Sequence, residues 1–133
     1  MKFTVKKHST EEVYETMCSF WDMHKFPRVD LSYLPQNTFI VYLEEIPIYS
    51  MCFYFTDAKG LAWIAWQISN KNVPFKKRDG ALAILLNHIE NYAKKKGVKM
   101  IITTSNTEPV VDVLTKSGFK VADQNINQYI KAL

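Results

Sequence analysis

The most constraining feature of this sequence is an alternation of extended and helical patterns in its second half. An apolar run at Leu61–Ser69 is followed by a helical stretch at Gly80–Lys96, and a second apolar run follows at Val98–Thr104. A strand, a helix and a strand in this order form a right-handed crossover, which leaves the two strands parallel in one sheet. The pattern therefore predicts an α/β fold in which helices cover a sheet.

The first half of the chain predicts further strands and one long helix. Phe3–Lys7 is typical of a short strand, and apolar residues at helical spacing predict a helix over Thr10–His24. Ser9 and Glu12 are spaced as a capping box at its start. The next runs are rich in β-branched and aromatic residues and predict an antiparallel meander: Thr38–Leu43, Ile46–Thr56 and Leu61–Ser69.

The end of the chain predicts a short helix and two closing strands. The helix would begin near Asn106 and end at Gly118, and the strands would be Phe119–Val121 and Gln128–Leu133. We therefore expect a single domain over residues 1–133. Its sheet would be mixed but mostly antiparallel, with about six or seven strands and helices on both faces.

Composition excludes several classes of protein. The chain has 133 residues, of which 47% are hydrophobic and 23% charged, as in ordinary globular domains. It has no apolar run long enough to span a membrane and no signal-peptide core, so we expect a cytoplasmic protein. Only two of the 17 basic residues are arginine, which argues against sequence-specific DNA reading. No cysteine or histidine pair has zinc-site spacing, so no metal site is expected.

One loop carries the pattern of an anion site. The run Pro74-Phe75-Lys76-Lys77-Arg78-Asp79-Gly80-Ala81 places three consecutive cations before a helix whose first turn contains glycine. The first backbone N–H groups of a helix lack intrahelical partners, and a glycine removes the nearest Cβ. A pyrophosphate or a sugar phosphate would fit this seat. The competing interpretation is a solvated basic loop that keeps the protein soluble.

Two further segments resemble the GNAT superfamily of N-acetyltransferases. Leu85–Lys99 is similar to the central helix and following strand of that family, and Asn106–Phe119 is similar to its later Asn–helix–Gly-Phe segment. The order of the predicted elements also matches. The resemblance covers roughly residues 61–121 well and the first 60 residues only in outline.

This resemblance implies binding of acetyl-coenzyme A as the acyl donor. The family motif Q/R-x-x-G-x-G/A grips pyrophosphate through backbone amides, and it aligns here with Lys77–Leu82. Gly80 matches the middle glycine, whereas Lys77 and Leu82 depart from the motif. The family also pairs pantetheine with a strand backbone. The cofactor-binding residues that this resemblance implies are Gln67, Ile68, Ser69, Lys76, Lys77, Arg78, Asp79, Gly80, Ala81, Leu82 and Asn106.

The catalytic groups are not assigned by the pattern. The tyrosine that the family uses as a proton donor corresponds to Leu114, which cannot donate a proton. Tyr129 is a weak candidate for the proton donor, because a strand aromatic explains it better. Glu45 is a weak candidate for the general base, because a solvated turn carboxylate explains it better. Trp63 and Trp66, three apart on a strand, are expected on opposite faces, with one of them in the core.

Three functional hypotheses remain open at this stage. The first is acetyl transfer from acetyl-coenzyme A to a primary amine on a small molecule or protein, by direct attack. The second is a non-catalytic GNAT-fold binding or interaction protein, such as a virus-encoded one, and Leu82 and Leu114 motivate it. The third, nucleic-acid binding, is disfavoured because lysines and acids are interleaved. An aromatic pocket formed by Phe20 and Trp21 of the first helix, with Phe26 after it, would favour an apolar or aromatic amine, but core packing explains these residues nearly as well. An aromatic surface also suits a homodimer.

Overall fold

The computed structural model describes residues 2–105 and 107–133. Within these residues, five strands form one sheet in the order β1-β2-β3-β4-β5. The first four strands are antiparallel neighbours, and β4 and β5 are parallel, as the crossover predicts. The bounds of the strands are β1 Phe3–Ser9, β2 Asn37–Leu43, β3 Ile46–Phe55, β4 Leu61–Ser69 and β5 Met100–Thr103.

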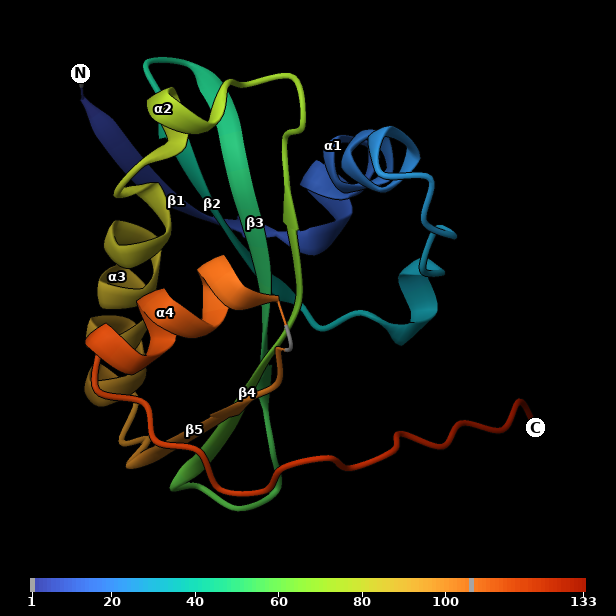
Figure 1. Ribbon diagram of the computed structural model, residues 1–133. Coiled ribbons are helices and arrows are strands. Elements are labelled where there is room, and N and C mark those ends of the chain that lie inside the picture. Colours follow the sequence, from blue (N-terminus) through green and yellow to red (C-terminus); the bar gives the residue numbers. More distant parts are fainter. Residues whose placement is uncertain (1, 106) are drawn as a thin grey trace.

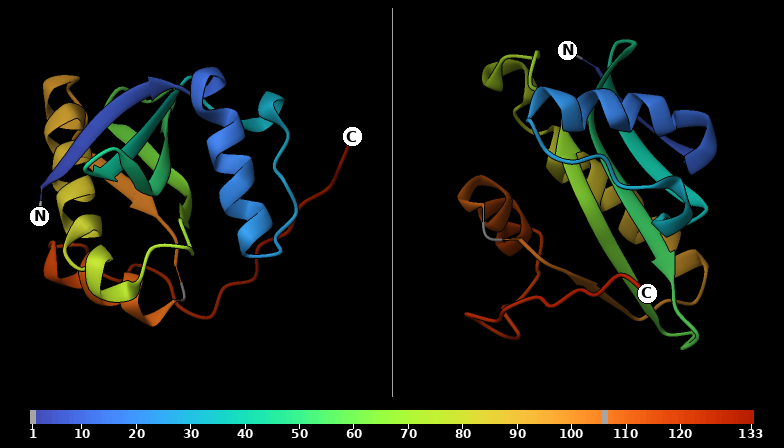
Figure 2. Two further views of the ribbon diagram at one scale, coloured as in Figure 1. Left: turned by 90° about the horizontal axis from the view of Figure 1, so that it is seen from above. Right: turned by 90° about the vertical axis from the view of Figure 1, so that its right-hand side faces the viewer.

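Helices cover both faces of this sheet (Figures 1 and 2). The structure has α1 on one face and α3 and α4 on the other, so the expected α/β architecture is confirmed. The bounds of the helices are α1 Thr10–Met23, the 3-10 turn η1 Leu31–Tyr33, α2 Phe75–Arg78, α3 Ala81–Lys95 and α4 Glu108–Lys116. None of the described helices is long and apolar enough to cross a membrane.

The two faces of the sheet carry two separate cores. The apolar stripe of α3 packs on the larger one, which includes Leu85 and Ile89 of the helix and Phe39 and Phe53 of the strands. The smaller core joins α1 to the opposite face, where Ile40 and Cys52 alternate with the inward residues of the larger core. Because β2 and β3 are buried on both faces, they are almost continuously apolar in sequence.

The expected capping box at the start of α1 does not form. Ser9 is the N-cap residue, but its side chain makes no capping hydrogen bond to any described residue. Ser9 is instead the last residue of β1 and pairs with Asn37. The backbone N–H of Thr10 donates to the carbonyl of Gln36 at 2.9 Å, so the sheet side of the junction satisfies one of the first four N–H groups of α1.

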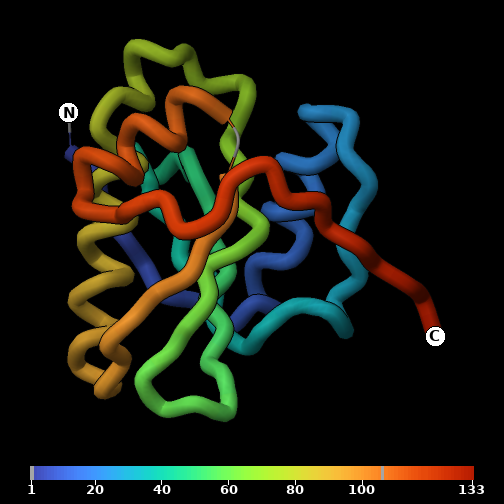
Figure 3. Tube along the Cα trace, turned by 60° about the horizontal axis from the view of Figure 1, so that its bottom comes forward, coloured from blue at the N-terminus to red at the C-terminus, as the bar shows by residue number. Residues whose placement is uncertain are grey.

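The predicted closing strands are also wrong. No strand is found in the described residues after β5, so the sheet has five strands rather than six or seven. Phe119 packs against the larger core, and the side chains beyond it are exposed. In Figure 3 this last segment crosses in front of β5 and β4 before it reaches the C-terminus. β-branched and aromatic residues at 119–121 and 128–133 suggested strands, but pairing also needs a partner edge, and β5 offers only four residues.

Candidate functional site

The strands β4 and β5 separate halfway along β4. Their pairing runs from Leu61 opposite Met100 to Ile64 opposite Thr103. Residues 65–69 of β4 have no described neighbour on that side, although β4 continues to Ser69. An unpaired strand edge facing a helix-flanked gap can hydrogen-bond an extended ligand in the way an added strand would.

A β-bulge in β4 marks the point of separation. The register of β4 against β3 shifts between the pairs Ser50–Ile68 and Cys52–Ala65, which leaves Trp66 and Gln67 in the bulge. Trp66 has a φ of 59°, a left-handed conformation that is uncommon for a bulky residue. The extra residue changes the alternation of side chains along the strand beyond this point.

The bulge places both tryptophans of β4 on the α1 face. Trp63 lies opposite Tyr54 of β3, and the indole N–H of Trp66 donates to the hydroxyl of Tyr54 at 2.6 Å. Tyr54 packs against the smaller core beneath α1. The expectation that the two tryptophans face opposite sides is therefore wrong, and neither is in the core, because Trp63 is 44% and Trp66 41% exposed.

The predicted anion seat lies at the start of α3. Gly80 is the N-cap of α3 with a φ of 84°, and a Cβ at this residue would meet nothing within 4 Å. No described side chain caps the helix, so its first N–H groups are not engaged by a neighbouring residue. The run Phe75–Arg78, expected as a loop, forms the short helix α2 just before this seat (Figure 1).

The three cations of α2 are free of carboxylate partners. Neither described salt bridge includes Lys76, Lys77 or Arg78. The guanidinium of Arg78 lies 6.0 Å from the ring centre of Tyr49 and 5.7 Å from that of Phe75. Its Nε is buried and has no hydrogen-bond partner among the described residues. An orphaned cationic donor beside an open helix N-terminus fits an anionic ligand such as a diphosphate.

Leu82, the departure from the family motif, does not obstruct this seat. Its side chain is only 6% exposed and packs in the larger core with Leu85 and Leu86. The helix therefore directs the large side chain inward, away from the N-terminal amides. Ala81 is also buried in that core, whereas Asp79 is exposed in the turn between α2 and α3.

The predicted pantetheine positions lie along the free part of β4. The Gln67 side-chain amide donates to the hydroxyl of Thr103 at 2.7 Å and so bridges the gap between β4 and β5. Ile68 is buried under α1. The His24 Nε2, at the C-cap of α1, donates to the carbonyl of Ser69 at 3.0 Å, a contact that the sequence did not suggest. The predicted residue Asn106 lies outside the described residues.

No described hydrogen bond or ion pair involves the side chains of the weak catalytic candidates, Tyr129 and Glu45. Tyr129 is 87% exposed in the extended C-terminal segment. Glu45 is exposed in the β2–β3 turn, at the end of the sheet where β4 leads into α2. Leu114 of α4, at the position of the family tyrosine, is buried in the larger core. Sequence reasoning missed Tyr54, whose role is visible only after β3 and β4 are paired.

The aromatic residues in and after the first helix are divided between the core and the surface. Phe20 and Trp21 are buried in the smaller core, and only Phe26 is exposed. Exposed aromatic side chains gather instead where Tyr54 donates to the carbonyl of Tyr33 at 3.0 Å and accepts from Trp66. Burial raises the pKa of the Tyr54 hydroxyl, so it is protonated at neutral pH.

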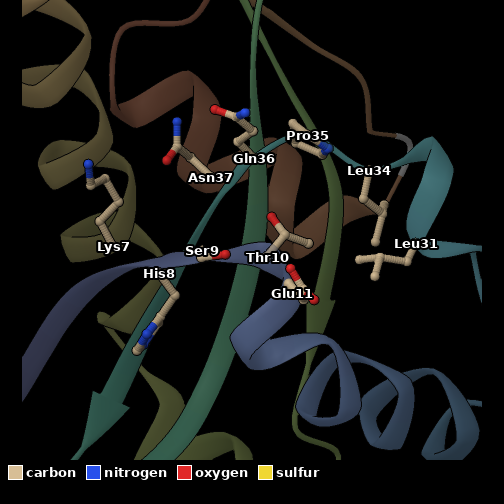
Figure 4. A pocket seen from close by; sticks show the side chains of 10 residues that line it. All are labelled: Lys7, His8, Ser9, Thr10, Glu11, Leu31, Leu34, Pro35, Gln36 and Asn37. Carbon is tan, nitrogen blue, oxygen red and sulfur yellow. The ribbon is translucent and has the colours of Figure 1, made fainter.

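Two open pockets flank the sheet at its opposite ends. One of about 560 Å³ lies at the β1–α1 junction, where His8, Thr10 and Gln36 contribute to its lining (Figure 4). The other, of about 370 Å³, includes Glu44 of the β2–β3 turn and Lys77 of α2, so it adjoins the anion seat. No described group of three or more histidine, cysteine or acidic residues could hold a metal ion.

We compared the chain with known protein sequences and solved structures. The sequence matches no family model and no curated protein sequence. An aminoglycoside acetyltransferase from an uncultured soil metagenomic sample, in complex with trehalose, superposes with a TM-score of 0.76 at 14% identity over 98% of this chain and 97% of its own.

Two solved structures with bound coenzyme are also similar. A predicted acetyltransferase from Clostridium acetobutylicum with acetyl-CoA has a TM-score of 0.66 at 14% identity, covering 96% of each chain. The N-acetylglutamate synthase from Neisseria gonorrhoeae, complexed with coenzyme A and N-acetyl-glutamate, has a TM-score of 0.66 at 15% identity over 92% of this chain and 29% of its own. The chain therefore has the fold of the GNAT acetyltransferases, as its sequence pattern indicates.

Proposed function

We propose that this protein is an acetyl-CoA-dependent N-acetyltransferase that acts on a primary amine. The observation that carries the proposal is the alignment of three features along one edge. These features are the cationic turn before α3, the open N-terminus at Gly80, and the free half of β4 from Ala65 to Ser69. Similar folds with acetyl-CoA or coenzyme A bound support the same donor.

Each part of the edge has a distinct task in this proposal. The N–H groups at the start of α3 hold the diphosphate, and Lys76, Lys77 and Arg78 neutralise its charge. The backbone of Gln67–Ser69 pairs with the pantetheine arm. Asn106 is expected near the same arm from the family motif.

The bound donor supplies an activated acetyl group as a thioester. The amine nitrogen attacks the carbonyl carbon, a C–N bond forms, the C–S bond breaks, and one proton passes from nitrogen to sulfur overall. The chain orients the two reactants at the bulge of β4. No described side chain is fixed as the base or as the proton donor, so the direct attack relies on positioning.

Coenzyme A binding tests the donor site by calorimetry on the purified chain. We expect the wild type to bind, and Lys77→Ala/Arg78→Ala to bind at least about tenfold more weakly, because each charge-assisted hydrogen bond contributes about 1.5–3 kcal/mol. Lys94→Ala/Lys95→Ala removes the same charge from the far end of α3 and serves as the matched control.

A wild type that does not bind coenzyme A would contradict the proposal. If both double variants lose the same affinity for coenzyme A, the cations of α2 do not form a specific site, and only the net positive charge of the chain attracts the ligand. The non-catalytic alternative is supported by the burial of Leu114 at the proton-donor position. Binding of acetyl-CoA without release of free coenzyme A over a panel of amines would favour that alternative.

A further inference from the structure

The α1 face of the sheet carries an exposed aromatic patch that the donor site does not use. We define the aromatic patch as Tyr33, Tyr54, Trp63, Trp66 and Ile102. Tyr54 hydrogen-bonds both Trp66 and the Tyr33 carbonyl, Trp63 lies opposite Tyr54, and Ile102 of β5 lies beside Trp63. These residues come from η1, β3, β4 and β5. Strand pairing and the two hydrogen bonds of Tyr54 connect them.

The aromatic patch lies where helices leave the sheet bare. The right-hand view of Figure 2 shows α1 crossing one end of the sheet, while the end near the β3–β4 turn has no helix over it. Trp63, Trp66 and Ile102 are each 41–44% exposed. Contiguous apolar patches on the surface of soluble proteins often mark binding sites.

The patch adjoins the proposed reaction centre. Trp66 lies in the bulge, two residues beyond Ile64, which is the last β4 residue that has a partner on β5. Its indole is held by the 2.6 Å hydrogen bond to Tyr54, and so it is oriented before any ligand arrives. A rigid, exposed indole beside the open strand edge can stack on an acceptor and direct its amino group to the thioester.

The charges around the patch select against a polycationic acceptor. At the end of α1, the carboxylate of Asp22 forms an ion pair with Arg28 of the following loop at 2.7 Å. The carboxylate of Asp30 accepts from the backbone N–H and the hydroxyl of Ser32. Arg28 neutralises Asp22, whereas Asp30 keeps its charge because its hydrogen-bond partners are neutral. One carboxylate can pair with a single ammonium group, but it cannot compensate the desolvation of several.

We propose that the acceptor is a primary amine carried on a planar aromatic body, and that Trp63 and Trp66 are its specificity-determining residues. This inference rests on the proposed function. This acceptor differs from sisomicin, which is bound in one similar structure, an aminoglycoside acetyltransferase from an uncultured soil metagenomic sample. The planar body would stack on the exposed indoles, and its single amino group would extend toward the open edge of β4.

The test compares two acceptors, tryptamine and kanamycin, in a coenzyme A release assay. We expect kcat/KM for tryptamine to exceed that for kanamycin by about tenfold or more. Trp63→Ala and Trp66→Ala should each raise KM for tryptamine about tenfold with the KM for acetyl-CoA unchanged, because each removes a stacking surface. In addition, 3-methylindole, which lacks the amino group, should inhibit competitively against tryptamine.

Phe55→Ala is the matched control. Phe55 is also an exposed ring on β3, but it lies on the α3 face, where it contacts Tyr92. This variant should leave the KM for tryptamine unchanged. If both tryptophan variants also leave it unchanged, the inference is overturned.

Coenzyme A binding, measured separately by calorimetry, keeps the two proposals distinguishable. A chain that binds coenzyme A but acetylates kanamycin better than tryptamine, or acetylates neither, overturns the acceptor assignment and leaves the donor site standing. A chain that does not bind coenzyme A fails at the proposed function. The inference would also be overturned if sedimentation shows a dimer and acrylamide does not quench the fluorescence of Trp63 and Trp66. A second copy of the chain would then occupy the patch.

Discussion

At the scale of single residues, Trp66 has the largest effect on the site. Its positive φ makes room for one extra residue in β4 and changes which side chains share a face. Residue spacing in the sequence cannot reveal such a bulge, because alternation is counted on the assumption of a regular strand. This is why the positions of the two tryptophans were the least predictable part of the site.

His8 on β1 makes the stability of the fold depend on pH. Its Nε2 lies 2.8 Å from the hydroxyl of Tyr42, and burial lowers its pKa below the ordinary 6.5, with Glu12 opposing that shift and Lys6 adding to it. Below about pH 6.5 the unfolded chain therefore binds more protons at this residue than the folded one does. Stability from His8 is present above that pH and is lost as the pH falls.

We expect the Tm of the wild type to fall between pH 7.5 and 6.0, and His8→Gln to reduce that fall. Thermal unfolding by circular dichroism at several pH values measures both. The window avoids Asp22 and Asp30, because hydrogen bonds from Arg28 and Ser32 lower the pKa values of these carboxyl groups below their ordinary range. An identical pH dependence in His8→Gln would show that other groups cause it.

The two cysteines are expected to be unreactive in the folded protein. Cys18 and Cys52 are both fully buried and free, and burial raises the pKa of the Cys52 thiol to about 11. Since the thiolate is the reactive form, neither should react with Ellman's reagent at pH 8 until denaturant is added. Titration before and after adding guanidinium measures this. Rapid labelling of the native chain would contradict the described burial.

At the scale of elements, helix α3 joins the core to the anion seat. Its N-terminal turn presents amides to solvent, while its apolar stripe anchors the same turn to the sheet. The sequence predicted this helix almost to its ends, because an amphipathic stripe and a C-terminal glycine are local signals. It predicted the meander equally well, because two tight turns and β-rich runs are also local.

The elements that sequence reasoning missed depend on distant partners. The capping box expected at Ser9 competes with the pairing of Ser9 to Asn37 in the sheet. The closing strands need a partner edge, and β5 has only four residues. The helix α2 has only four residues, Phe75–Arg78, and its polar composition resembles that of a loop. The prediction of the anion seat rests on contiguous residues, whereas the aromatic patch is assembled from four elements and has no contiguous signal in the sequence.

Leu82→Ala tests whether this residue is a core anchor. We expect a loss of about 2–5 kcal/mol in the free energy of unfolding, since the side chain is buried among Leu85 and Leu86. Ile84→Ala on the same helix is the matched control, because Ile84 is 42% exposed and should cost much less. Urea denaturation gives both values. Equal losses in the two variants would contradict the inward placement of Leu82.

At the scale of the whole molecule, the sheet lies between α1 on one face and α3 and α4 on the other, and an extended segment follows α4 (Figures 1 and 3). The segment after Val121 is exposed throughout, including Ile126, Tyr129, Ile130 and Leu133. It contributes little apolar burial to the fold. Residues 1–121 therefore hold nearly all the contacts that stabilise the domain.

A chain shortened to end at Val121 should therefore unfold at nearly the same temperature as the full chain. Removing side chains that are already in water changes the free energy of unfolding by less than about 1 kcal/mol. Differential scanning calorimetry of the two chains makes the comparison. A large drop in Tm would show that the segment packs as the strands that the sequence predicts.

The open side of β5 has a consequence beyond the site. Four consecutive peptide groups, from Met100 to Thr103, have no strand beside them on the side away from β4 in the described part of the chain. Water forms hydrogen bonds with those groups in dilute solution, but an extended polypeptide can replace the water by pairing with β5 as a further strand. Crowded conditions thus favour lateral growth of the sheet from this rim, and the brevity of β5 is what limits it.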